Sequence, residues 1–160
     1  MKNQKGFSLI ELLIVVVIIG IIAAIAIPNL LAARRSANEG STVASLRTLT
    51  GAQATYQSTS PTGDFGTAAE LVAGGLIDTV LGSGNKSGYA FTLNRLLRSA
   101  TEPARFDHSA IPTQFGGIGA TGTRSFYSNE SGVIYANTTA AAPTADGATR
   151  VVTGGTPLNQ

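Results

Sequence analysis

Glu11 is the residue whose chemistry stands out, because this acid lies at the head of a segment of apolar side chains. Sixteen residues in a row, Leu12 to Ile27, are apolar or glycine, and Phe7 lies four residues before the acid. A carboxylate at the centre of a membrane helix costs about 2.5–3.5 kcal/mol, so an acid in such a segment is a candidate functional group. The alternative is that Glu11 extends to the lipid headgroups at little cost.

His108 is the only histidine, and Asp107 and Ser109 flank it. Consecutive side chains point in different directions, so this triplet does not converge as a catalytic triad does. We therefore expect His108 to lie at the surface or in a loop. The chain has no cysteine and its acids are scattered, so the sequence indicates no thiol nucleophile, disulfide or metal-ligand cluster. It predicts a protein that is not an enzyme and needs no cofactor.

Arg95, Arg98 and Arg105 form a small basic cluster in the sequence. This cluster is a candidate contact for DNA or another anionic surface, and the alternative is a solvated or intersubunit face. The net charge is only +2, and without the first six residues the chain has nine basic and nine acidic side chains. Such a balance gives no electrostatic reason for nucleic acid to be the main partner.

The apolar segment is long enough to cross a membrane. As a helix, Leu12–Ile27 would be roughly 24 Å long and Phe7–Ala33 about 40 Å. One interpretation is a signal peptide cleaved after the small residues of Ala24–Ala26, and another is a plain transmembrane anchor. Positive charges favour the cytoplasmic side of a membrane segment. The lysines and the N-terminal amine before the segment narrowly outnumber the two arginines after it, so its start is expected inside the cell. Neither interpretation explains Glu11.

The residues around Glu11 decide between these interpretations. The stretch "KGFSLIELL" has a short basic leader that ends in Gly6, then Phe7, then an acid four residues later. It resembles the signature of type IV prepilins, and the match continues through "IVVVIIGIIAAIAIPNLLAARRSAN" over about the first 50 residues. The resemblance implies that a prepilin peptidase cuts between Gly6 and Phe7, that the new amine of Phe7 is N-methylated, and that the apolar segment is retained.

The resemblance also implies a role for Glu11. Cleavage creates a cation at Phe7, and in a filament of packed helices Glu11 of one subunit can meet the Phe7 amine of another. An ion pair buried in this way mainly sets register, because removal of one partner leaves the other charge unpaired. Glu11 is therefore expected to align subunits, with no catalytic part.

Gly20 and Pro28 are the weak points of the helix. Pro28 removes a backbone donor and crowds the carbonyl four residues earlier, so a kink near Ala24 is expected. Family resemblance implies that the stretch from Gly20 to Pro28 can lose helical structure when subunits pack. The alternative is an ordinary kinked anchor helix.

The helical pattern continues beyond the apolar segment to about residue 57. Val43, Leu46, Leu49 and Tyr56 follow helical spacing, and Gln53 interrupts their stripe. The run "STSPTGDFG" then ends the helix, because proline and glycine lie in a cluster typical of turns. We expect one helix over about 7–57.

A small head of mixed structure follows the helix. Thr67 and Glu70 have the spacing of a capping box before a short helix that glycines close. Strand patterns cover 88–94 and, less clearly against a loop, 105–109, and a hairpin turns at 128–132. Beyond residue 138 we expect an extended or mobile tail, with Val151 and Val152 able to add an edge strand.

These elements predict an α+β pilin fold with a long N-terminal helix, a small antiparallel sheet and a flexible tail. The expected parts are a leader (1–6), a membrane and filament-core helix (7–33), its amphipathic continuation (34–58), a head (59–137) and a tail (138–160). By resemblance, the chain is the major pilin of a type IV pilus that supports adhesion, motility or DNA uptake. It would reside in the inner membrane before assembly and then in a surface filament.

The resemblance implies several partners: other copies of the chain, a prepilin peptidase that also methylates, an inner-membrane platform with an ATPase, and an outer-membrane secretin. Two alternatives stay open at this point. One is a type II secretion pseudopilin, although only Asp146 among the last 30 residues is acidic, whereas pseudopilins often carry an acidic calcium loop there. The other is a DNA-binding minor pilin that uses Arg95 and Arg98.

Overall fold

The computed structural model describes residues 6–158 of the chain. Residues 1–5 of the expected leader, and the last two residues of the tail, lie outside this range. The chain divides into two compact units, Met1–Arg34 and Arg35–Gln160. We describe each unit by itself, and call the second one the head.

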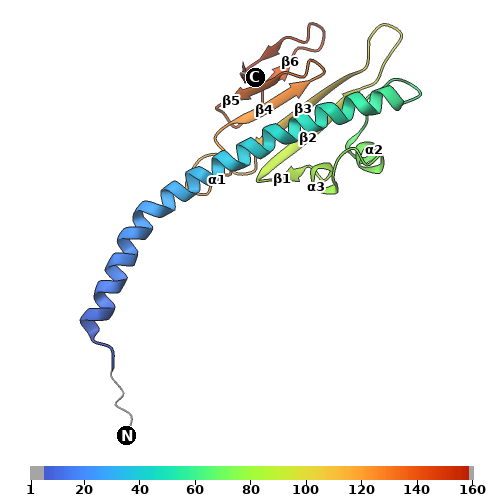
Figure 1. The fold of residues 1–160 in the computed structure, drawn as a ribbon. Coiled ribbons are helices and arrows are strands. Elements are labelled where there is room, and N and C mark those ends of the chain that lie inside the picture. Colours follow the sequence, from blue (N-terminus) through green and yellow to red (C-terminus); the bar gives the residue numbers. More distant parts are fainter. Residues whose placement is uncertain (1–5, 159–160) are drawn as a thin grey trace. The chain divides into compact units, whose positions relative to one another are not determined.

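One helix, α1 (Leu9–Thr59), runs from the first unit into the head (Figure 1). Its 51 residues agree with the length expected from the sequence. Gly51 lies inside it without ending it, because the packed face of a helix outweighs the cost of one glycine. The helix ends before Pro61, where the N–H of Ser60 donates to the carbonyl of Tyr56 at 2.8 Å.

The main sheet of the head has six antiparallel strands in the order β1-β2-β3-β4-β5-β8 (Figure 1). Its strands are β1 (Asn85–Lys86), β2 (Tyr89–Leu96), β3 (Arg105–Pro112), β4 (Ser125–Asn129), β5 (Ile134–Asn137) and β8 (Thr156–Pro157). A separate pair joins β6 (Thr144–Ala145) to β7 (Val152–Thr153). The sheet confirms the α+β class.

β2 and β3 form the longest hairpin of the sheet, with eight paired residues on each strand. Side chains on β3 alternate between half-buried and buried from Arg105 to Ala110, as expected when one face of a strand covers a core. The ambiguous segment 105–109 is therefore strand. The next hairpin, β4–β5, turns where the sequence predicts it, and Gly132 has the positive φ of +73° that such a turn favours.

Two short helices, α2 (Ala68–Ala73) and α3 (Thr79–Gly82), precede the sheet. The predicted capping box opens α2: the N–H of Glu70 donates to the Thr67 hydroxyl at 3.3 Å, and the N–H of Thr67 donates to the Glu70 carboxylate at 2.7 Å. After α2, Gly75 has a φ of +66°, which completes the predicted glycine end.

The core lies between the head part of α1 and the sheet. Leu46 and Leu49 are fully buried in it, and Val43 and Tyr56 pack against its edge. Gln53, which the sequence suggested would interrupt the stripe, is fully buried as well. Its side-chain amide donates to the carbonyl of Gly66 at 2.9 Å and accepts from the N–H of Gly66 at 2.8 Å. Both halves of the amide are satisfied, so this polar side chain fits the core.

Two expectations are wrong in detail. His108 lies on β3, is fully buried and stacks on Phe106 with ring centroids 4.5 Å apart, so it is not a surface or loop residue. The tail 138–158 contains β6, β7 and β8. The edge strand that joins the main sheet is β8, at Thr156–Pro157, whereas Val152 belongs to the separate pair.

Candidate assembly site

The expected cleavage point lies just before the first helix. Gly6 and Phe7 have no regular structure, and α1 begins two residues later at Leu9. Phe7 is 83% exposed, and a Cβ added at Gly6 would meet no atom within 4 Å. This segment is therefore non-helical and exposed, so it is accessible to a peptidase.

Glu11 lies in the first turn of α1. A carboxylate there interacts favourably with the positive end of the helix dipole. Within residues 6–158 it forms no ion pair or side-chain hydrogen bond, and it is exposed. The carboxylate lies four residues after Phe7 and is open to a charge from outside its own chain, and the cleavage that would create an amine at Phe7 stays a prediction.

The surface of the first unit is apolar. Large hydrophobic side chains from Phe7 to Leu30 are at least half exposed, and none of the most apolar window of this helix is buried. By length and composition the helix can cross a membrane. Exposed apolar surface on this scale requires lipid or other helices around it.

α1 continues through both weak points. Gly20 has open space around it, and Pro28 lies inside the helix. The side-chain amide of Asn29 donates to the carbonyl of Ile25 at 3.1 Å, close to the Ala24 carbonyl that loses its partner at Pro28. The kink near Ala24 and the loss of helix from Gly20 to Pro28 on packing stay predictions.

In the head, a buried acid joins α1 to the sheet. Glu39 accepts hydrogen bonds from the N–H of Thr123 at 2.8 Å, from its hydroxyl at 2.7 Å and from Nε of Arg124 at 2.9 Å. Burial alone would raise the pKa of Glu39, but these hydrogen bonds outweigh it and hold the pKa below its usual value. Arg124 also lies 5.4 Å from the ring centroid of Phe126, so both charges are compensated.

The three arginines of the basic cluster lie at the β2–β3 end of the head, and each has a local partner. Arg95 forms an ion pair with Glu70 at 2.8 Å, and Arg105 pairs with Glu102. The backbone N–H of Arg98 donates to Asp64 at 2.8 Å. Acids therefore alternate with the arginines, which weakens the positive potential of this end. Contact with DNA stays a prediction.

A second network fixes the tail to the sheet. Arg150 has a left-handed φ of +58° and donates to Glu130 at 2.6 Å and to Asp107 at 2.7 Å. Tyr127 donates its hydroxyl to Asp107 as well. The carboxylates raise the pKa of Arg150, and burial followed by the bond to Asp107 raises the pKa of Tyr127. The network keeps Arg150 charged and Tyr127 protonated. These polar contacts hold the tail against the sheet.

The comparisons with known proteins concern the N-terminal region. Residues 1–27 match the prokaryotic N-terminal methylation motif. The chain is 56% identical over 57 residues, 36% of its length and 44% of the relative's, to the type IV wide pilus major component PilA4 of Thermus thermophilus. It is 37% identical over 57 residues, 36% of its length and 41% of the relative's, to the type II secretion system core protein G of Klebsiella pneumoniae.

Over part of its length, the chain is therefore similar to type IV pilins and to type II secretion pseudopilins. A fimbrial protein of Pseudomonas aeruginosa is 79% identical over 29 residues, which are 18% of this chain and 19% of the relative. The match to each of these relatives covers less than half of the relative's length. No solved structure matches this chain significantly. The resemblance drawn from the sequence is confirmed.

Sequence reasoning missed the polar groups that organise the pilin-like head. Glu39 lies on the same helical face as Leu46 and Leu49, and an acid on an otherwise buried stripe was the available signal. The sequence around Arg150 did not indicate its role, because Asp146 is the only other charged residue in the tail 138–160. Its partners, Asp107 and Glu130, lie 43 and 20 positions away in the sequence.

Proposed function

We propose that this chain is a structural subunit that polymerises through its N-terminal helix, and specifically the major subunit of a type IV pilus. The methylation motif over residues 1–27 supports the general part of this proposal, and the 56% identity over 57 residues to a wide pilus major component favours the pilus. A motif that is cut and methylated at Phe7 keeps the apolar segment in the mature protein, where a secretion signal would be discarded. The open surface of that segment and the free carboxylate of Glu11 suit packing against copies of the same helix.

The proposed sequence of events begins in the membrane. The apolar segment anchors the chain, a prepilin peptidase cuts after Gly6, and the amine of Phe7 is methylated. An inner-membrane platform with its ATPase then moves the subunit into the filament, which passes an outer-membrane secretin. During this step Glu11 loses lipid neighbours and gains the Phe7 amine of a neighbouring copy, which aligns the two helices.

The second candidate function is that of a type II secretion pseudopilin, which forms a short periplasmic filament. The matches to core protein G favour it, at 37% identity to the Klebsiella protein and 39% over 69 residues to that of Vibrio cholerae. The two functions share processing and helix packing, and they differ in where the polymer is found.

Mass spectrometry of material sheared from the cell surface tests the proposal. An abundant N-terminal peptide that begins at N-methylated Phe7 is expected there for a pilus subunit. The same peptide confined to the membrane fraction would favour the pseudopilin. A mature chain that begins near Ile27 would show a discarded signal and overturn both functions.

Two variants separate processing from assembly. Gly6→Val places a branched side chain at the cleavage point, so the unprocessed chain is expected to accumulate. Glu11→Ala is expected to be processed and methylated but to yield few filaments, while Glu11→Asp, which keeps the charge, restores part of the assembly. Normal filament numbers in Glu11→Ala would contradict the pairing between Glu11 and the Phe7 amine.

A further inference from the structure

In the loop between β3 and β4, residues 113–123 differ in character from the rest of the head surface. This stretch, which Arg124 follows, contains no charged residue. Its tip presents Phe115, 40% exposed, and Ile118, 83% exposed. No other large apolar side chain within residues 35–158 is as exposed as Ile118. Two exposed apolar side chains at one loop tip form a small apolar patch, which is a candidate contact for an apolar partner.

The stem of this loop is firmly held, so the exposed tip is a built feature. The N–H of Thr121 donates to the carbonyl of Gln114 at 2.9 Å, and Phe115 and Gly122 form a bridge. A Cβ at Gly122 would lie 1.9 Å from the hydroxyl oxygen of Tyr89, which packs directly on the stem. Finally, the side-chain amide of Asn38 donates to the carbonyl of Thr121 at 2.9 Å. The last bond fixes the stem to α1.

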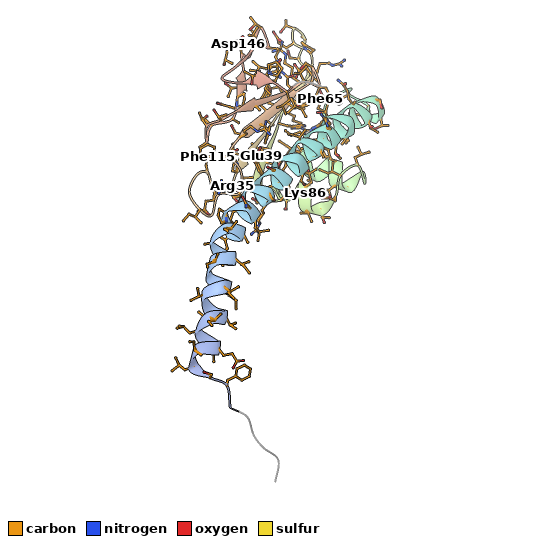
Figure 2. All side chains as sticks on the ribbon, turned by 60° about the vertical axis from the view of Figure 1, so that its left-hand side comes forward. Arg35, Glu39, Phe65, Lys86, Phe115 and Asp146 are labelled. Carbon is orange, nitrogen blue, oxygen red and sulfur yellow. The ribbon has the colours of Figure 1, made fainter. Side chains whose placement is uncertain are left out.

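This attachment lies early in the head part of α1, a short way along the chain from the apolar segment. Asn38 follows Ala33, the last residue of that segment, by five positions, which is about 7.5 Å of helix. The headgroup region of a bilayer is roughly 5–7 Å thick on each side of its hydrocarbon core. Figure 2 shows Phe115 at the same end of the head as Arg35 and Glu39. Measured along α1, the loop is therefore attached within roughly one headgroup layer of the end of the segment.

The charges nearby suit an anionic lipid surface. Arg34 and Arg35 lie between the apolar segment and the loop attachment. The acid at this end, Glu39, is buried and neutralised by Arg124 at 2.9 Å. Cationic side chains next to an apolar membrane segment attract acidic lipids, and apolar side chains then add to the binding.

We propose that the tip of this loop, Phe115 and Ile118, inserts into the headgroup region of the membrane before assembly. The loop is then a second membrane contact, and it restrains the head on the bilayer beside its own anchor. The inference rests on the membrane-anchored stage of the proposed function. Extraction of the subunit into the filament would have to break this contact as well as remove the helix from lipid.

Single labels test the inference, because the chain has no cysteine of its own. Ile118→Cys, in the full chain, carries a polarity-sensitive fluorophore in vesicles of phosphatidylcholine and phosphatidylglycerol. Thr101→Cys is the matched control, since Thr101 is an exposed residue in the loop at the other end of β3. Val16→Cys, within the apolar segment, reports whether the chain is inserted at all. Lipids that carry a nitroxide at a shallow or a deep position then quench each label according to its depth.

We expect the Ile118 label to shift its emission to shorter wavelength and to be quenched most by the shallow nitroxide. The Val16 label should be quenched by the deep nitroxide. The Thr101 label should be quenched by neither. A deeply quenched Val16 label with an unquenched Ile118 label would overturn the loop contact alone. An unquenched Val16 label would overturn the membrane-anchored stage. An Ile118 shift without quenching, which grows with protein density, would assign the tip to a second copy and overturn the lipid contact.

Discussion

Glu39 and Arg124 lie 85 positions apart in the sequence, and Nε of Arg124 donates to the Glu39 carboxylate at 2.9 Å. The pair joins the long helix to the first residues before β4. The helix that carries Glu39 continues into the apolar segment, and Arg124 directly precedes β4 in the centre of the sheet. A force applied through the anchor helix would therefore reach the sheet partly through this contact.

Glu39→Gln is expected to lower the free energy of unfolding of the head by about 1–3 kcal/mol, because the charge-assisted bonds to Thr123 and Arg124 are weakened in a buried position. Urea unfolding of the full chain in detergent, followed by circular dichroism, measures this change. Glu102→Gln is the control, since Glu102 is exposed and its pair with Arg105 should contribute little. Equal losses in both variants would contradict the role of Glu39.

The lowered pKa of Glu39 also predicts a pH dependence. A carboxylate whose folded pKa lies below its unfolded value of 4.5 stabilises the fold fully above that pH, and the contribution is lost as the pH falls through the folded pKa. The wild type should therefore lose more stability than Glu39→Gln when the pH is lowered below about 4.5. Parallel pH profiles of the two proteins would speak against this assignment.

His108 predicts a second, separate pH window. Burial lowers the pKa of His108 from 6.5 to about 4, and neither ring nitrogen has a hydrogen-bond partner within the described structure. Between these values the unfolded chain binds the proton and the folded chain does not, so stability should fall by about 3 kcal/mol as the pH drops from 7 to 4. His108→Leu should flatten this slope in urea unfolding and raise stability at pH 5. A slope that survives in the variant would assign it to other groups.

Arg150→Ala is expected to free the tail while the rest of the head stays folded. The variant removes the ion pairs to Asp107 and Glu130 and leaves these carboxylates without their cation, a loss of about 1–3 kcal/mol that acts locally. Hydrogen exchange of β7 and β8 should become faster, and that of β2 should not change. Arg47→Ala is the matched control, since Arg47 is exposed on α1. Protection of β8 that equals wild type would show that the network is dispensable.

Gly122→Ala is expected to destabilise the head by about 1–3 kcal/mol, because the added methyl overlaps the fully buried Tyr89. Gly40→Ala is the counterpart, since its Cβ meets nothing within 4 Å on the exposed face of α1. It should raise stability by about 0.5–1 kcal/mol through helix propensity. Thermal unfolding of the two variants measures both changes. Unchanged stability in Gly122→Ala would contradict the close contact between Gly122 and Tyr89.

Local patterns in the sequence were enough to predict the helix, the capping box and the β4–β5 hairpin. In each case the residues that decide the structure lie within a few positions of one another, as Thr67 and Glu70 do. The same holds for the assembly segment, because Gly6, Phe7 and Glu11 are read in one short stretch. Expected features of this segment that depend on neighbouring subunits stay predictions.

The contacts that only folding decided are those between distant polar groups. Nothing near Gln53 indicated that its amide would pair with the backbone of Gly66, and nothing near His108 indicated that β3 would bury it against Phe106. The tail is the clearest example, since Arg150 finds its acids on other strands. The sequence by itself determined the apolar anchor, the processing motif and the helix, because these follow from short-range order. The tertiary structure decided which charges are buried and paired, because burial depends on strand register and on packing between segments far apart in the chain.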